Sequence, residues 1–493
     1  MSISTFSVLN IGVTALDAMQ QAQAVVANNM ANANTPGYVQ ESAALAEAPP
    51  YPPLPSNNAP MISGQLGQGV QVAAINRQTS AFVNQQDRAN QGAYNMYKTH
   101  SQNLSSIEAI LNEPSSQSMQ NALDQFFQSW QTLSTDPSNA AARQSVLSSA
   151  QTLGQTFQTV TTQLQQTQTN LGTTIIGQLG ELNQYASQVA TLNKQIAGVL
   201  AAGENPNQLL DQRGVLLNQM AGLAGISYSQ DPSMNGAVNV SIQPPTGSPI
   251  PLVTGSTATP YPPGATVSPT TLQPQTTSVA SLNPYLSYIT SGSIAGNVQS
   301  YDDTSNVLSN LDAMLTKVAN TVNAQQQKGY DYNSSTHSPA LFAINYTAAN
   351  HVYLSLSNGL TPDQVGAAGS SNQPGNNANA LAITQLQNKS YNFTYSYNSL
   401  ATNTPVSSTY SGTFDQAIGQ MVSNIGVETA AVNSSQATAQ ALSQQSSQLR
   451  QSISGVDQNQ QAANMVAYQN SYNAAAKFIS IFDQMLQTLI SNV

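Results

Sequence analysis

The chain has 493 residues, of which only 6% are charged, and its formal net charge is -10. An apolar content of 40% at this length is enough for several domains with hydrophobic cores. Eleven basic residues, scattered singly, do not form the positive stripe that nucleic-acid binding needs, and the lack of cysteine excludes disulfides, thiolate catalysis and cysteine-based zinc sites. No run approaches the roughly 20 apolar residues of a membrane span, so we expect neither nucleic acid nor a membrane as partner.

The low charge has two interpretations that the sequence leaves open. One is compositional drift. The other is adaptation to acid or variable pH, because a surface with few carboxylates changes its charge little on acidification. The N-terminus carries no Lys or Arg before Arg77, so it lacks the positive region of a cleaved secretory signal peptide. We expect a protein with this N-terminus to leave the cell by another route.

The first 33 residues carry apolar side chains at the spacing of a coiled-coil seam. Two seam positions alternate along the segment: one holds Leu9, Leu16 and Met30, and the other holds Met19, Val26 and Ala33. This spacing predicts a helix that packs against other helices.

Helical periodicity resumes after residue 90 in three stripes, over 93–111, 119–133 and 146–200. Pro114 and Pro137 separate the stripes as helix breakers. The third stripe keeps one register over its whole length, although its glycines are points where the helix can bend or break, at Gly172, Gly177 and Gly180. Helices of this length predict a rod-like bundle.

The period changes to two in the middle of the chain, where Val238, Val240 and Ile242 alternate with polar residues. We therefore expect a mainly α fold with β insertions (α+β, multidomain), in which both ends of the chain form a long helical coiled-coil rod. The predicted helical rod domain comprises 66–225, 295–329 and 414–454, and the predicted β-rich, outward-facing insertions are 226–294 and 330–413.

The last 29 residues form a second seam, with steps of three and four that continue to the C-terminus. Its members are Met465, Tyr468, Tyr472, Ala475, Ile479, Phe482, Leu486, Leu489 and Val493. A buried side chain of this kind contributes about 1.5 to 3 kcal/mol, whereas ordering the backbone costs about 1 to 2 kcal/mol for every residue. Since only about one residue in three is in the seam, we expect the terminal assembly helices, 1–50 and 455–493, to be disordered in the monomer and ordered by assembly.

The sequence offers no arrangement that we would nominate for catalysis, cofactor binding or metal binding. The three histidines, His100, His337 and His351, lie far apart, and His100 falls in a helical seam where a buried structural imidazole is the better interpretation. No pair of carboxylates is placed for general acid and base work.

A motif near the N-terminus resembles the signature of bacterial flagellar axial proteins, the rod, hook and hook-associated families. Its residues are Asn28, Asn29, Asn32, Asn34, Thr35, Pro36, Gly37 and Tyr38. The segments 454–457, 461–465 and 468–472 are similar to the C-terminal end of the same families.

Internal segments single out one of these families. The segments 126–130, 136–137 and 141–144 resemble the helical domain of the hook-associated protein 1 family, which forms the hook–filament junction. A further hallmark of that family is resembled by the residues Leu209, Leu210, Asp211, Gln212 and Arg213. The segment 67–72, with Arg77 after it, is similar to a third hallmark, which is shared with other axial proteins. The chain departs from the family at Gln458, Gln460 and Gln461, where relatives often carry acids, and at Gly214, where a second Asp is frequent.

The resemblance implies a structural protein without enzymatic activity or cofactors, located outside the cell in the flagellum. It implies a ring of subunits between the hook protein and the adjacent junction protein, export through the flagellar type III apparatus, and a chaperone on the C-terminal helix. Two alternatives stay open. One is another axial protein, of the hook or distal rod, and the other is a secreted enzyme or adhesin with coiled-coil ends, such as a peptidoglycan hydrolase.

Overall fold

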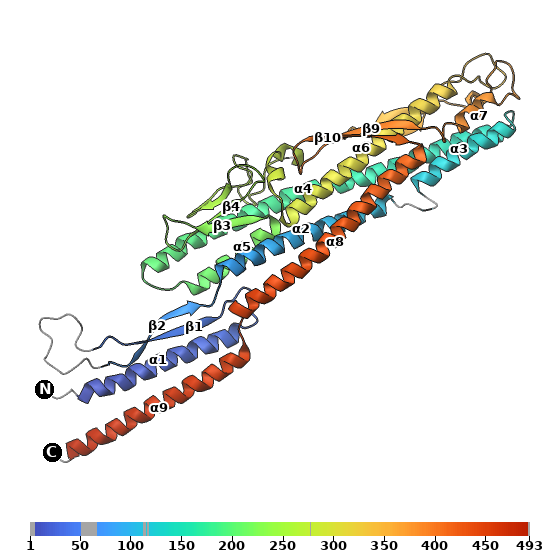
Figure 1. Cartoon of the computed structure of the whole chain (residues 1–493). Helices are drawn as coiled ribbons and strands as arrows, with labels where there is room; N and C mark the ends of the chain where they lie inside the picture. The colour runs from blue at the N-terminus through green and yellow to red at the C-terminus, as the bar shows by residue number, and fades with distance from the viewer. Residues whose placement is uncertain (1–4, 51–66, 112–114, 116–117, 277, 492–493) are drawn as a thin grey trace.

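The computed structural model describes residues 5–50, 67–111, 115, 118–276 and 278–491. The chain forms an elongated molecule with both termini at one end (Figure 1). Its helices are α1 (Thr5–Asn32), α2 (Ala81–Leu111), α3 (Met119–Thr135), α4 (Ala140–Ala201), α5 (Asn207–Leu223), α6 (Gly292–Gln326), α7 (Ala378–Thr384), α8 (Phe414–Ser454) and α9 (Gln458–Ser491). Its strands are β1 (Glu41–Glu47), β2 (Val70–Arg77), β3 (Ile226–Gln230), β4 (Val238–Ile242), β5 (Ile250–Thr254), β6 (Thr257–Ala258), β7 (Phe342–Tyr346), β8 (Val352–Leu356), β9 (Tyr391–Asn398) and β10 (Pro405–Gly412).

The strands form small antiparallel sheets between strands that follow one another in the chain: β1 with β2, β3 to β6 in order, β7 with β8, and β9 with β10. The predicted fold class, mainly helical with β insertions, is confirmed. The sequence did not indicate β1, because Glu41–Glu47 is rich in alanine and lacks the β-branched and aromatic residues that favour strands.

Helix α4 runs unbroken for 62 residues. It begins after Pro137 at Asn139, whose Oδ1 accepts hydrogen bonds from the backbone N–H groups of Ala141 and Ala142. The glycines that were possible bends lie within the continuous helix. At Gly180 the reason for glycine is close packing, since a Cβ there would collide with the side chain of Gln273.

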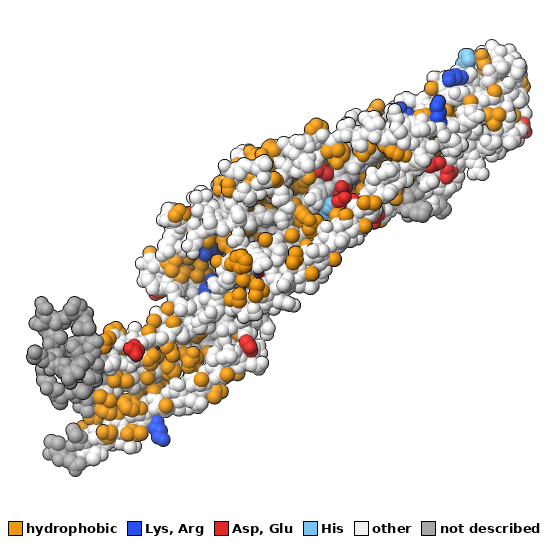
Figure 2. Space-filling model, viewed as in Figure 1, with side chains coloured by type: hydrophobic (Ala, Val, Ile, Leu, Met, Phe, Trp, Pro, Cys, Tyr) orange, Lys and Arg blue, Asp and Glu red, His pale blue; other side chains and the backbone are white. Residues whose placement is uncertain are grey.

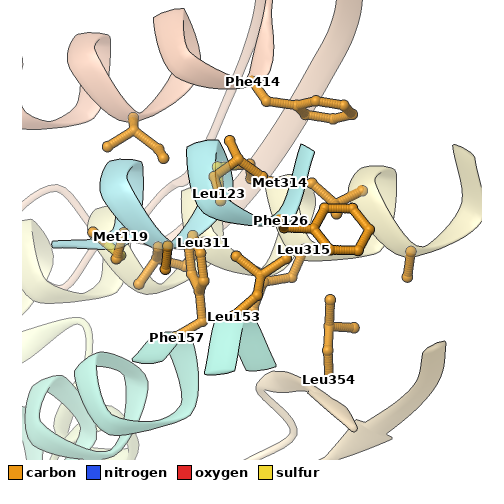
Figure 3. Packing of buried hydrophobic residues seen from close by; sticks show 14 of the residues in the cluster. Met119, Leu123, Phe126, Leu153, Phe157, Leu311, Met314, Leu315, Leu354 and Phe414 are labelled. Atoms are coloured by element: carbon orange, nitrogen blue, oxygen red, sulfur yellow. The ribbon is translucent and has the colours of Figure 1, made fainter. Parts of the chain in front are cut away.

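The rod, which we define as α2 to α8 with their hairpins, has an extensive hydrophobic core. Leu104, Phe126, Trp130 and Leu311 are fully buried in it. Figure 3 shows side chains of α3 packed against those of α4 and α6, among them Met119, Leu123, Leu153, Phe157, Met314 and Leu315. The stripes read from the sequence therefore supply two core clusters, one around α3 and the first half of α4 and the other around the second half of α4, α5 and the sheet of β3 to β6. His100 is also buried in the rod, with its Nε2 2.6 Å from Asp303 Oδ2.

Helices α2 and α8 lie side by side and antiparallel along the rod (Figure 1). Arg450 Nε donates to Asp87 Oδ2 at 2.9 Å near one end of the pair, and Ser101 Oγ donates to Asn433 Oδ1 nearer the other. The first and last thirds of the chain therefore build the rod together.

The terminal module consists of α1, β1, β2 and α9 and lies at the end of the molecule that carries both termini (Figure 1). Helices α1 and α9 pack against each other. The helical conformation is interrupted at Gly455, between α8 and α9. Asp457 caps α9 by accepting a hydrogen bond from the backbone N–H of Asn459 at 2.9 Å. Among the described residues, no helix combines the length and the hydropathy needed to cross a bilayer.

Candidate functional site: the terminal helices and their joint to the rod

The seam predicted on α9 faces α1. Phe482 is buried, and Met465, Tyr468, Tyr472, Ala475, Ile479 and Leu486 are half-buried. The side chains of Leu489 and Val493 lie outside the described residues. This seam is therefore largely occupied within the chain itself.

Helix α1 packs through a face of small residues. Ala18, Ala22 and Val25 are buried, as is Val26 from the predicted seam. Small side chains let two helices approach closely. The other predicted seam residues lie beside this face: Leu9, Leu16 and Met19 are half-buried, and Met30 is exposed.

A second apolar stripe on α9, which we call the outer stripe, consists of Phe478, Ile481 and Met485. These side chains are 41%, 49% and 62% exposed. Their spacing of three and four places them on one helix face, next to the seam that contacts α1. Figure 2 shows hydrophobic side chains crossing the terminal module on the face in view. Contiguous exposed apolar side chains of this kind mark interaction surfaces.

Asn29 of the N-terminal motif is a buried junction between four segments. Its Oδ1 accepts the Tyr38 hydroxyl at 2.7 Å and the Glu41 backbone N–H at 2.9 Å. Its Nδ2 donates to the Glu41 carbonyl at 2.7 Å and to Gln461 Oε1 at 3.2 Å. One side chain thus joins α1, the turn after it, β1 and the start of α9, and its hydrogen-bonding capacity is fully used.

The remaining motif residues form the turn that ends α1. Asn32 Nδ2 donates to Asn28 Oδ1 at 2.9 Å, and Thr35 Oγ1 donates to Asn32 Oδ1 at 3.1 Å. Gly37 has a φ of +84°, and a Cβ at this position would collide with Val215 of α5. Asn34 and Pro36 are exposed on the turn.

The two resemblance segments meet at Asp211. Its Oδ1 accepts Arg77 Nε at 2.9 Å and also pairs with Arg77 Nη2. Its Oδ2 accepts the backbone N–H of Val39, the residue after Tyr38, at 3.3 Å. This cluster, with Asn29 and Gln461, is the joint between the terminal module and the rod.

Arg213 secures the rod side of the joint. It is buried, and its Nη1 donates to Asn193 Oδ1 at 2.9 Å and to the Gly236 carbonyl at 2.6 Å. These bonds tie α5 to α4 and to the turn between β3 and β4. Leu209 and Leu210 are half-buried, and Gln212 is exposed.

Burial shifts the pKa values of ionisable side chains at the joint. Burial raises the pKa of the Asp211 carboxyl above its ordinary value, an effect that the Arg77 guanidinium opposes. Burial, followed by the positive charges of Arg77 and Arg88, lowers the pKa of Arg213 to about 10. Burial, with Glu41 and Asp211, raises the pKa of the Tyr38 hydroxyl.

This arrangement is suited to holding segments together rather than to chemistry. The hydrogen bonds of Asn29 and Asp211 at the joint connect different segments of the chain. In the part of the chain that the structure describes, no three His, Cys, Asp or Glu residues are grouped so that they could hold a metal ion.

Sequence reasoning found the two motifs but missed the contacts between them. Arg77 and Asp211 are 134 positions apart, and Asn29 and Gln461 are 432 apart. Contacts between single polar residues at such separations leave no periodic signal. Gln461, one of the departures from the family pattern, accepts a hydrogen bond at the joint without carrying a charge.

Comparisons with known protein families match most of the chain. A family model described as the flagellar hook-associated protein FlgK helical domain matches residues 104–342. A flagella basal body rod protein model matches residues 9–38. A model of the C-terminal region of flagellar basal body rod FlgEFG proteins matches residues 447–492.

Relatives and a solved structure agree with these matches. Flagellar hook-associated protein 1 of Bacillus subtilis is 27% identical over 517 residues, which covers 99% of each chain. The protein of the same name from Salmonella typhimurium is 31% identical over 339 residues, covering 66% of this chain and 57% of that protein. The structure of the flagellar hook junction protein FlgK from Burkholderia pseudomallei has a similar fold, with a TM-score of 0.58 at 17% identity, covering 75% of this chain and all of that one. The chain belongs to the flagellar hook-associated protein 1 (FlgK) family.

Proposed function

We propose that this protein is the structural subunit at the hook–filament junction of the bacterial flagellum, outside the cell, and that it assembles through the terminal module. The family is a structural one. The observation that carries the proposal is the joint, where the motifs of both chain ends and of α5 meet. A rigid rod held to a pair of terminal helices by a fixed joint is suited to placing those helices among the helices of neighbouring subunits.

The terminal helices make two kinds of contact, one within the subunit and one between subunits. The seam on α9 docks α1 within the subunit, and one edge of Phe478 also reaches α1 at Gly12. The rest of the outer stripe and the exposed Met30 of α1 contact neighbouring copies. Copies arranged in a ring bury these side chains, with the hook protein below and the adjacent junction protein above. Each neighbour supplies apolar surface that a single subunit lacks.

Before assembly, the exposed stripe requires protection. We infer that an export chaperone covers the C-terminal helix in the cytoplasm, because Ile481 and Met485 would otherwise promote premature association. Export follows through the flagellar type III apparatus with an uncleaved N-terminal signal. Terminal helices with few buried side chains unfold readily for passage through a narrow channel.

The first test is the position of the protein in the flagellum. Labelled protein should mark one narrow band where hook and filament meet. Label along the whole hook or in the distal rod would instead support another axial protein.

The second test separates contacts within the subunit from contacts between subunits. It uses substitutions at adjacent positions of α9. Ile481→Asp places a carboxylate on the outer stripe and should abolish incorporation, because the charge would be buried between subunits. The monomeric Ile481→Asp variant should have the same thermal unfolding midpoint as the native protein and should be as soluble without the chaperone. Ser480→Asp adds the same charge at the adjacent exposed position and should incorporate normally.

Phe482→Asp disrupts the contact with α1 and should also prevent incorporation, as should Leu489→Asp. Normal filament attachment by the Ile481→Asp variant would refute the role of the outer stripe. Normal attachment by the Phe482→Asp variant would refute the role of the seam.

A further inference from the structure

A long open groove runs along the rod at the end away from the termini. It has a volume of about 850 Å³. Its floor is one face of α6 from Ser309 to Gln325, continued by Lys328 just after the helix, and its side is formed by Asn392–Ser396 of β9. Tyr346 and Val352 also line it. Figure 1 places α6 and β9 far from the terminal module. The groove is thus separate from the assembly surface described above.

The groove gathers positive charge in an acidic protein. All five arginines donate hydrogen bonds to protein acceptors within the fold. The six lysines form no ion pair in the part of the chain that the structure describes. Three of them, Lys317, Lys328 and Lys389, line this groove.

The acidic side chain that also lines the groove is already engaged. Asp312 Oδ2 lies 2.7 Å from Nδ1 of His351, and its Oδ1 accepts the backbone N–H of Val352 at 2.7 Å. None of the three lysines forms an ion pair with Asp312, and they outnumber this carboxylate, so the groove keeps an excess of positive charge. Figure 2 shows basic side chains grouped at this end of the molecule. A concave site with charge of one sign concentrates ligands of the opposite sign.

The wall of the groove is the open edge of a sheet. Within the described residues, β9 pairs with β10 alone, so its second edge has no partner strand. Five consecutive residues, Asn392 to Ser396, line the groove. Because successive side chains of a strand point to opposite faces, an uninterrupted run of this kind means that the strand borders the groove with its edge. An open edge offers unpaired backbone N–H and C=O groups to an added strand.

We propose that this groove binds an extended acidic polypeptide segment of a partner protein, which adds as a strand to β9 and places its carboxylates against Lys317, Lys328 and Lys389. Lys317 lies on α6 and Lys328 in the turn directly after its end, eleven residues further along a nearly helical path and therefore about 16 Å away. About five residues of extended chain span this distance. Only a polypeptide has a backbone that can form hydrogen bonds with the edge of β9. Other polyanions therefore lack this contribution to binding.

The test uses the full-length protein and a fluorescein-labelled ten-residue peptide of alternating glutamate and valine. Fluorescence anisotropy at low salt should show saturable binding. The triple variant Lys317→Gln, Lys328→Gln, Lys389→Gln should bind about tenfold or more weakly, because the charge-assisted contacts are lost. The matched variant Lys98→Gln, Lys194→Gln, Lys477→Gln has the same net charge and should bind as the native protein does.

Two further probes test the class of ligand without altering the protein. The same peptide with alternate backbone nitrogens methylated, in either register, cannot pair as a strand and should bind about tenfold more weakly. An alginate oligosaccharide carries the charge without the peptide backbone and should also bind more weakly. No binding, equal binding of the methylated peptides or the oligosaccharide, or equal weakening in both triple variants would overturn the proposal. Incorporation into the flagellum is a separate readout, so its failure bears on the terminal module alone.

Discussion

The rod and the terminal module each contain a helix of just over 30 residues, but the two regions bury very different amounts of side chain. Helix α2 has 31 residues and α9 has 34. In the rod, Leu104, Phe126 and Trp130 are completely buried. Among the described side chains of α9, only Gln461 and Phe482 are buried. The rod therefore contains its own core, whereas the terminal module has most of its apolar side chains at a surface that other subunits can cover.

This difference gives the rod and the terminal module different roles in the subunit. A core such as that of the rod supports independent folding. Two helices that share one half-buried seam gain little to offset the backbone entropy of ordering them. We infer that the terminal module becomes fully ordered on assembly, with the joint fixing its direction relative to the rod.

The largest expected contrast comes from truncating one aromatic side chain in each region. Trp130→Ala should lower the free energy of unfolding by about 3 to 5 kcal/mol, because it leaves a cavity in a closed core. Phe482→Ala should change the monomer by less than about 1 kcal/mol, since the seam contributes little before assembly. Urea unfolding followed by circular dichroism measures both. Equal losses would remove the distinction between the two regions.

A smaller effect is expected at the joint. Asn29→Ala removes the acceptor of the Tyr38 hydroxyl proton and the partner of the Glu41 backbone and of Gln461 Oε1, which should destabilise the terminal module by about 1 to 3 kcal/mol. The stability of the rod should be unchanged. Hydrogen exchange of β1 and β2 in assembled subunits reports this effect locally, because the joint is expected to be fully formed only there. Gln21→Ala, at an exposed position of the same helix, is the control, with an expected change within about 0.5 kcal/mol.

Gly37 tests the same joint through backbone geometry. Gly37→Ala should cost about 1 to 2 kcal/mol, because φ is positive there and the new methyl group meets Val215. Combining it with Val215→Ala should recover the part due to the collision. The thermal unfolding midpoints of the two single variants and the double variant measure the coupling. Strict additivity would show that Val215 does not confine this turn.

The smallest effect is the pH dependence of the rod. Burial raises the pKa of Asp302, and burial together with Asp124 raises the pKa of Asp415. A carboxyl whose pKa is higher in the folded than in the unfolded state binds protons preferentially in the folded state. Its contribution to stability is therefore fully present below the unfolded pKa and is lost as the pH rises through the folded value.

Acidification from pH 7 towards about pH 4 should accordingly not weaken the rod through these groups. Hydrogen bonds from Ser233 lower the pKa of Asp231, which makes a contribution of the opposite sign. Urea unfolding at both pH values, with Asp302→Asn as the comparison, measures the balance. Unfolding of the rod above about pH 4 would favour compositional drift over acid adaptation as the cause of the low charge.

The sequence predicted the rod helices well because their signal is periodic. The stripes over 93–111 and 119–133 correspond to α2 and α3, and the long stripe corresponds to α4. Prolines and the Asn139 cap mark their boundaries. The periodic pattern of apolar residues does not depend on which element a helix packs against. The helices could therefore be located without knowledge of what they contact.

The joint could be predicted only in part. The resemblance located both motifs, but their meeting at Asp211 depends on tertiary packing of segments far apart in the chain. The packing face of α1 was equally hidden, because Ala18 and Ala22 carry little hydrophobic signal beside Leu16 and Met19. The domain boundaries and the role of the seam residues in assembly stay predictions.

Hydrogen exchange of the dilute monomer, followed by mass spectrometry, tests the central claim most directly. The account predicts rapid exchange over residues 5–32 and 458–491 and strong protection of α2, α4 and α6 in the same molecule. Protection of the two terminal helices equal to that of the rod, at concentrations where the protein is monomeric, would contradict it.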